Sequence, residues 1–180
     1  MIEAHTNRAL WIGCLWPVPT VNGHSPAVSH EFEPGERYLP NGNLNYAVHL
    51  GVDIMFRRQA GDPPSRSRFV SFDDVRIMAT VPGNVWDAGE TKLGHFVEID
   101  HGKVGGVGML TFYQHMSRLE RPWKKGDAVF PGMPLGVMGA DPTDPEGLVH
   151  LHFEVWLPDG KPKGKWSVDP QPYLDRWVRL

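Results

Sequence analysis

The sequence predicts an all-β or β-dominated domain, and three observations support this prediction. Apolar segments of strand length recur along the chain and end at glycine, proline or polar residues. The chain contains 20 Gly and 17 Pro, which is many for 180 residues and is typical of short strands separated by tight turns. Between these residues, no apolar repeat of helical period continues over a convincing length.

The expected elements follow one another as a meander. Residues up to about Tyr46 are rich in turns, and strands are expected within residues 47–56, 75–89, 95–102, 108–116, 124–139 and 149–157. The polar residues 57–74 are expected to form a surface loop, and residues 168–179 to end the chain with a short helix. Because no internal repeat or long linker divides the sequence, we predict one domain over residues 1–180.

Charge and cysteine content argue against several classes of protein. The formal net charge of -3 provides no positive surface for nucleic acid or for an anionic membrane. The single cysteine, Cys14, cannot form an internal disulfide. The apolar residues 9–16 are about half as long as a transmembrane helix and lack the flanks of a signal peptide, so we expect a core strand there. Neither membrane insertion nor nucleic-acid binding is expected.

The nine histidines are the unusual feature of the composition. In "VHLHFEVWL", residues 149–157, alternation places His150 and His152 on one face of the expected strand, and the opposite face carries Leu151, Phe153 and Val155. His49 and Asp53 lie four residues apart, and a bend at Gly51 can direct both side chains to one point. Two histidines, one carboxylate and an open position for water make up a catalytic zinc site.

Each of these motifs is weak when taken alone, because HxxxD and HxH also occur by chance. His115, in the strand-like segment "YQH", adds one more imidazole. Turns, loops and strand ends account for the remaining histidines, which are His5, His24, His30, His95 and His101. The segment "HEFEP" is not the helical HExxH zinc motif, because Pro34 stands where the second histidine is required and no helix is expected.

Taken in order, six segments resemble the catalytic domain of the M23 metallopeptidases, the lysostaphin and LytM type of cell-wall endopeptidase: "HLGVD", "GNVWDAG", "HFVEIDHG", "FYQHM", "KKGDAVFPGMPLGVMG" and "HLHFEVW". Their combination is far more specific than any one of them. The resemblance covers about residues 46–174, whereas residues 1–45 match only loosely, through "WPVP" and "VSHEF". It implies an antiparallel β-sheet or sandwich with a substrate groove, bordered by the loops at residues 57–74 and 139–148.

Carried over by position, the resemblance implies a Zn²⁺ ion held by His49, Asp53 and His152, with His115 and His150 as the catalytic pair beside the reacting water. All five positions are filled, which favours an active zinc endopeptidase over a non-catalytic regulatory or structural module, for example one associated with a phage tail or with cell division. The implied substrates are peptide stems or cross-bridges of bacterial peptidoglycan. Action outside the cytoplasm is therefore expected, in the periplasm, the cell wall or a phage particle, although no signal peptide is recognised. A monomer is favoured, and the choice between glycyl-glycine and D-alanine–diaminopimelate bonds stays open.

Several polar side chains near the motifs have two interpretations each. Glu154 shares the strand face of His152 and either orients that ligand or forms a structural salt bridge. Tyr46 and Tyr113 are candidates for binding substrate, with core or rim positions as the alternative. The resemblance also suggests a latent state, in which Asn41 or Asn43 fills the open position of the metal.

Overall fold

The computed structural model describes residues 14–180 apart from residues 44, 46, 64–66, 144–146 and 163. These described residues form one 11-stranded sheet and one short helix. The elements are β1 (Pro26–His30), β2 (Val52–Arg57), β3 (Phe69–Val70), β4 (Arg76–Met78), β5 (Gly83–Thr91), β6 (Gly94–Val104), β7 (Val107–Leu119), β8 (Ala128–Val129), β9 (Pro134–Ala140), β10 (Val149–Trp156), β11 (Ser167–Val168) and α1 (Gln171–Leu174).

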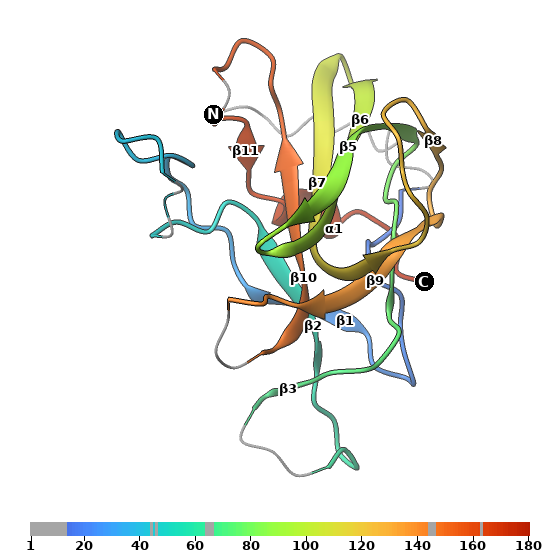
Figure 1. Cartoon of the computed structure of the whole chain (residues 1–180). Helices are drawn as coiled ribbons and strands as arrows, with labels where there is room; N and C mark the ends of the chain where they lie inside the picture. The colour runs from blue at the N-terminus through green and yellow to red at the C-terminus, as the bar shows by residue number, and fades with distance from the viewer. Residues whose placement is uncertain (1–13, 44, 46, 64–66, 144–146, 163) are drawn as a thin grey trace.

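The paired strands run antiparallel, and the main order across the sheet is β1-β2-β10-β9-β7-β6-β5-β8 (Figure 1). This confirms the predicted β-dominated antiparallel fold with a short helix near the C-terminus. The strands form one open sheet rather than a sandwich of two sheets.

The strand that organises the sheet is β10. It pairs with β2 and with β7, and its first residues also pair with β9. As the alternation predicts, three of its side chains are fully buried in the core, namely Leu151, Phe153 and Val155. Burying a large apolar side chain contributes roughly 1.5–3 kcal/mol, so this face anchors β10 firmly. The opposite face is left to the polar side chains of the same strand.

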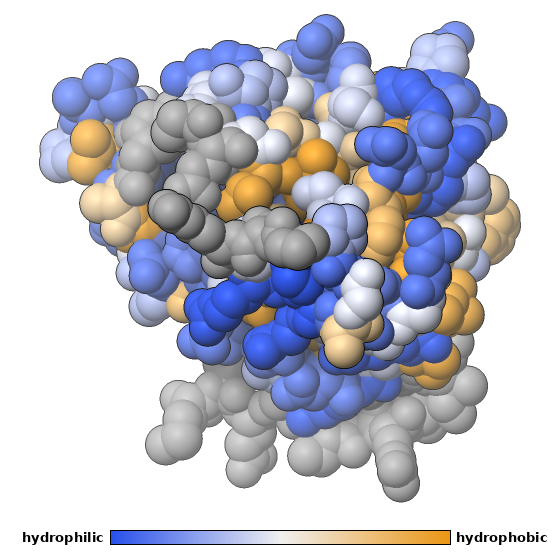
Figure 2. All heavy atoms as spheres, turned by 90° about the horizontal axis from the view of Figure 1, so that it is seen from below, coloured by the Kyte–Doolittle hydropathy of each residue, from blue (hydrophilic) through white to orange (hydrophobic). Residues whose placement is uncertain are grey.

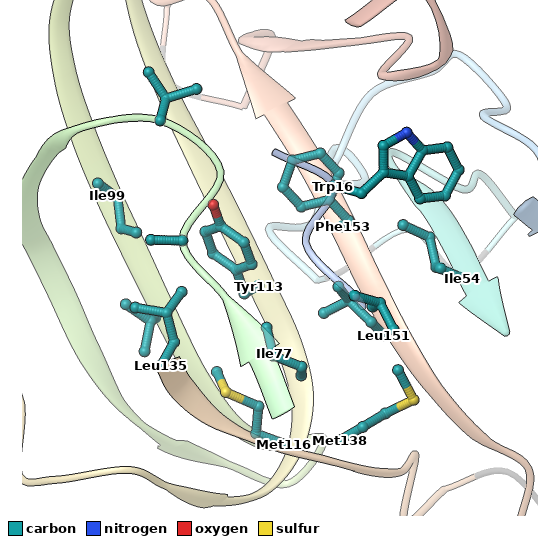
Figure 3. Close-up of a cluster of buried hydrophobic side chains, with 14 of the residues drawn as sticks. Trp16, Ile54, Ile77, Ile99, Tyr113, Met116, Leu135, Met138, Leu151 and Phe153 are labelled. Carbon is teal, nitrogen blue, oxygen red and sulfur yellow. The ribbon is translucent and has the colours of Figure 1, made fainter. Parts of the chain in front are cut away.

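The main core collects side chains from much of the chain (Figure 3). Ile54 of β2, Ile77 of β4 and Ile99 of β6 are each fully buried in it. Trp16, which precedes the first strand, is buried there too, and its Nε1 donates a hydrogen bond to the Leu174 carbonyl oxygen at 2.7 Å. Residues before β1 and residues of α1 are therefore fixed to the same core.

Three sequence expectations differ from the structure in detail. The strand expected over residues 47–56 begins only at Val52, and before it the structure has an isolated bridge between Glu33 and His49 rather than a strand. The expected surface loop at residues 57–74 contains β3, which pairs with β2. Of the apolar patch at residues 9–16, only the last three residues are described, and they form an isolated bridge between Leu15 and Val178 rather than a strand.

The surface is consistent with the modest hydropathy of the sequence. On the face shown in Figure 2, hydrophilic residues predominate and hydrophobic residues show in smaller areas between them. Among the described residues, no helix has the length and apolar character needed to cross a bilayer.

Candidate metal centre and active-site groove

Three side chains that the sequence predicts as metal ligands meet at one point. His49 Nε2 lies 3.0 Å from Asp53 Oδ1 and 3.0 Å from His152 Nδ1, and the latter two atoms are 3.1 Å apart. Zinc with bonds of about 2.05 Å in a tetrahedron separates its ligand atoms by about 3.3 Å. The observed triangle is therefore close to the size that a zinc ion requires.

The outer hydrogen bonds of both histidines fix which nitrogen faces this point. His49 Nδ1 donates to the Glu31 carbonyl oxygen at 2.7 Å, and His152 Nε2 donates to Glu154 Oε1 at 3.1 Å. In the neutral ring, the other nitrogen then carries a lone pair directed at the centre. Two lone pairs and the Asp53 carboxylate repel one another unless a cation lies between them. The donor set therefore fits a metal ion.

The backbone brings the three ligands together through register and a glycine. His152 of β10 pairs directly with Asp53 of β2. A Cβ atom placed on Gly51 would lie 2.5 Å from the Phe153 carbonyl oxygen and 2.9 Å from His152 Cε1. Only glycine therefore allows the chain between the first two ligands to approach β10 this closely.

The pKa values show that the centre favours positive charge. Burial opposes a charged imidazole, but hydrogen bonds to Asp53 and Glu154 outweigh it and raise the pKa of His152 to about 9. Burial likewise opposes ionisation of Asp53, yet hydrogen bonds with His152 and His49 hold the pKa of that carboxyl well below its usual range. Both shifts have the direction expected of a centre that stabilises positive charge.

A fourth imidazole lies beside this triangle. His30 of β1 stacks on His49 with ring centroids 4.0 Å apart, and its Nδ1 lies 3.4 Å from Asp53 Oδ2. Ligand atoms of His30, His49 and Asp53 also fall within 4.8 Å of one another, which makes an alternative metal group. In the set with His152 the atoms are 3.0–3.1 Å apart and the lone pairs converge, whereas His30 contacts the other carboxylate oxygen.

The two predicted catalytic histidines lie next to the triangle. His115 Nδ1 donates to the Leu93 carbonyl oxygen at 2.9 Å, and His150 Nδ1 donates to the Leu148 carbonyl oxygen at 2.8 Å, so each Nε2 is left as the reactive nitrogen. The two rings are 4.7 Å apart, and His150 Nε2 lies 3.9 Å from Asp53 Oδ1. Burial and then the neighbouring imidazoles lower the pKa of His115 to about 4. His115 is therefore a neutral base near pH 7.

These residues form the floor of a cavity of about 580 Å³. Its walls come from the segment before β2, the turn between β5 and β6, and the loop after β9, represented by Val48, Lys92 and Thr143. Of the two loops expected at the groove, the described part of residues 139–148 lines it, but no described residue of 57–74 does. That expectation is wrong because the segment with β3 extends toward the bottom of Figure 1, beyond the far end of β2.

Tyr113 does not line the cavity, contrary to the sequence expectation. It is fully buried, packs on Phe153 and hydrogen-bonds to Thr80 (Figure 3). The expectation assumed a regular strand, but His115 has a φ of 64°, which breaks the alternation between the two residues. Gln114 lines the groove instead, opposite His152.

Two further expectations on the groove have different outcomes. Tyr46 lies outside the described residues. Asn41 and Asn43 are exposed, hydrogen-bond to each other and do not line the cavity, so the structure does not place them at the metal position. Asn45 lines the cavity, but its side chain is bonded to the backbone of Glu36 and Ala47.

Glu154 fulfils both interpretations that the sequence left open. One carboxylate oxygen accepts from His152, and the other accepts from Trp156 Nε1 at 2.7 Å, from Ser167 Oγ at 2.9 Å and from Arg37. Sequence reasoning missed three residues of the site: Arg37, His30 and Asp141. The Oδ2 atom of Asp141 lies 4.0 Å from His115 Nε2. The histidine composition could have drawn attention to His30, but a lone arginine in a turn-rich segment carries no such signal.

Comparisons with known proteins bear on the family and the fold of this chain. The L-Ala–D-Glu endopeptidase of Bacillus subtilis is 30% identical over 73 residues, which are 38% of this chain and 22% of that protein. Among solved structures, a zinc-containing peptidase from Vibrio cholerae has a TM-score of 0.56 at 21% identity, covering 89% of this chain and 39% of that one. The catalytic domain of the antimicrobial peptidase lysostaphin from Staphylococcus simulans has a TM-score of 0.53 at 21% identity, covering 86% and 94%.

A chain in a SpoIIQ–SpoIIIAH pore-forming complex has a TM-score of 0.60 at 22% identity, covering 92% of this chain and 93% of that one. At such identities these structures show the shared fold alone. The family described as peptidase family M23 matches residues 68–170, more than half of the chain. This match includes His115, His150 and His152 but begins after His49 and Asp53. The chain belongs to peptidase family M23.

Proposed function

We propose that this protein is a zinc-dependent endopeptidase that hydrolyses peptide cross-links of bacterial peptidoglycan. One observation carries the proposal. Three lone-pair donors converge within 3.1 Å on the floor of a groove, with two further imidazoles directly beside them. Membership of a peptidase family, and the resemblance to a zinc-containing peptidase and to an endopeptidase of bacterial origin, support the same reaction.

In this proposal, His49, Asp53 and His152 hold the ion. Bound Zn²⁺ supplies Lewis acidity, which polarises a peptide carbonyl and makes a water molecule acidic enough to react near neutral pH. The three protein donors leave room for substrate on the groove side. Glu154 and the Glu31 carbonyl keep the two ligand imidazoles in the required tautomers.

His115 and His150 manage the protons. The Nε2 atom of His115 accepts a proton from the attacking water, because its low pKa keeps the ring neutral near pH 7. Asp141, 4.0 Å away, stabilises the imidazolium that forms. His115 would then pass this proton to the leaving amine, while His150, which faces the same space from β10, would help to position the reacting groups.

The shape of the site suits an extended, flexible peptide. The cavity is lined by apolar side chains such as Leu93 and Phe112, besides the polar floor. We infer that the enzyme acts outside the cytoplasm, in the periplasm, the cell wall or a phage particle, as a monomer. We also infer that residues 14–45 belong to the same domain, because Trp16 and Val18 lie in the main core.

The test combines metal analysis with hydrolysis of purified cell walls. We expect the zinc-loaded protein to clear a wall suspension, Asp53→Ala to lose both zinc and activity, and His115→Ala to retain zinc but lose activity. His95→Ala, a histidine of β6 that does not line the groove, is the matched control and should behave as wild type. Stoichiometric zinc without wall hydrolysis would favour a non-catalytic module, and full activity in Asp53→Ala would refute the metal site.

A further inference from the structure

A second cavity lies beside the groove and has a different character. It measures about 350 Å³, a volume in the range of small-ligand sites. Five aromatic side chains line it, which are Tyr38, Trp86, Phe112, Trp156 and Trp166. Trp86 and Tyr38 are 44% and 42% exposed, so part of each ring is accessible to a ligand.

The two cavities are neighbours. Arg37 and Phe112 line both of them. His152, Glu154 and Trp156 share one face of β10, as the hydrogen bonds of Glu154 to its two neighbours show. Trp156 stands four residues beyond His152, which is about 13 Å along a strand at roughly 3.3 Å per residue. A single extended ligand can therefore span both cavities.

The charges already present decide which ligand the aromatic cavity suits. Arg37 lies over the Trp156 ring, 5.3 Å from its centroid, and Lys125 Nζ lies 3.9 Å from the centroid of Trp86. Both cations oppose a cationic ligand at these rings. Arg37 is in turn neutralised by its ion pair with Glu154, so the cavity does not select an anion strongly.

A ligand with an apolar face and polar edges remains, and a pyranose ring has this form. Its C–H groups stack on an aromatic face, while its hydroxyl and acetamido groups meet polar side chains such as Glu98 and Ser167 at the rim. We propose that this cavity binds an N-acetylated amino sugar of the glycan strand to which the substrate peptide is attached. This inference rests on the proposed function, because it uses the same substrate.

The test compares two substrates that differ only in the sugar: a cross-linked peptide dimer with its disaccharides and the same dimer without them. We expect kcat/KM of the wild type to be about three- to tenfold higher with the sugars, the effect of one aromatic stacking contact. Trp86→Ala and, separately, Tyr38→Ala should bring this ratio close to one, and Trp86→Phe should restore most of it. Phe130→Ala, 59% exposed and lining neither cavity, is the control with an unchanged ratio.

A binding titration with an N-acetylglucosamine tetrasaccharide, followed by tryptophan fluorescence, gives a readout independent of hydrolysis. Saturable binding that Trp86→Ala weakens and Phe130→Ala does not supports the proposal. Equal kcat/KM on both substrates, or an equal loss on both in Trp86→Ala, would overturn it and assign the cavity to peptide. If neither substrate is cleaved, the proposed function fails, and the sugar titration still decides the inference.

Discussion

Replacing Glu154 by glutamine tests whether the second carboxylate of the site orients the metal ligand. Glu154 is 1% exposed and is bonded to His152, Trp156, Ser167 and Arg37. Glutamine keeps the size of the side chain but has one acceptor oxygen instead of two. Either His152 therefore loses its acceptor, or Trp156, Ser167 and Arg37 lose theirs.

The expected effect on zinc follows from the lost orientation. Removing a partner of this kind from a metal-binding histidine lowers metal affinity about 10- to 100-fold. The effect on stability follows from Arg37, whose side chain is 21% exposed and loses its buried counter-charge. Breaking a fully buried pair costs about 3–5 kcal/mol. Because water reaches part of Arg37 and glutamine retains one acceptor, we expect the free energy of unfolding to fall by only about 1–3 kcal/mol.

Zinc affinity is measured by competition with a chromophoric chelator, and stability by urea denaturation of the metal-free protein. Glu120→Gln removes a carboxylate paired with Arg76 at the surface and is the matched control, with an expected change below about 1 kcal/mol and unchanged zinc affinity. A folded Glu154→Gln protein with wild-type zinc affinity would show that Glu154 does not orient His152, and the assignment of the outer partners would be wrong.

Three further changes probe other parts of the structure. Gly51→Ala places a Cβ against the Phe153 carbonyl oxygen, so urea denaturation should show a loss of about 1–3 kcal/mol and zinc competition a weaker site; wild-type values would refute the close approach. His30→Ala removes the contact with Asp53 Oδ2 and should weaken zinc binding by about tenfold, whereas unchanged binding would leave His30 without a role at the centre. Burial lowers the pKa of His101 to about 4, so the unfolded chain binds its proton first and wild-type stability falls as pH drops from about 6.5 to 4. Measured by urea denaturation, His101→Gln should remove up to about 3 kcal/mol of that fall in stability. An unchanged dependence of the unfolding free energy on pH would contradict the lowered pKa of His101.

The core strands could be predicted from alternation, and the gathering of the five candidate site residues could be predicted from the resemblance of the motifs taken together. Alternation in β10 separates Leu151 and Phe153 from His150 and His152, and it holds because β10 is paired on both sides. The same rule failed in β7, where the positive φ of His115 changes the face on which the chain continues. The sequence around Tyr113 does not indicate this interruption of the alternation, because it arises from the irregular pairing between β7 and its neighbours.

The outer partners of the ligands could not be predicted, for two different physical reasons. The atom of Glu31 that holds His49 is a backbone oxygen, which any residue would provide, so its identity leaves no trace in the sequence. Arg37 reaches Glu154 across 117 positions of the chain from a segment without regular structure. Contacts of this kind depend on where a turn-rich segment lies on the finished sheet, which local patterns do not specify.

The candidate site is divided between strands inside the family match and a turn-rich segment outside it. His115, His150 and His152 lie on strands whose pairing is fixed by the core, within residues 68–170. His49 lies just before β2, and Glu31 and Arg37 precede it. The Glu31 carbonyl oxygen sets the tautomer of His49, and Arg37 is the counter-charge of Glu154, the partner of His152. Both contacts therefore depend on residues 30–50. Arg37 also borders the aromatic cavity. The segment that would complete the proposed metal centre thus lies next to the proposed sugar contact, and we expect a change in its sequence to alter substrate choice while the strands keep the three histidines in place.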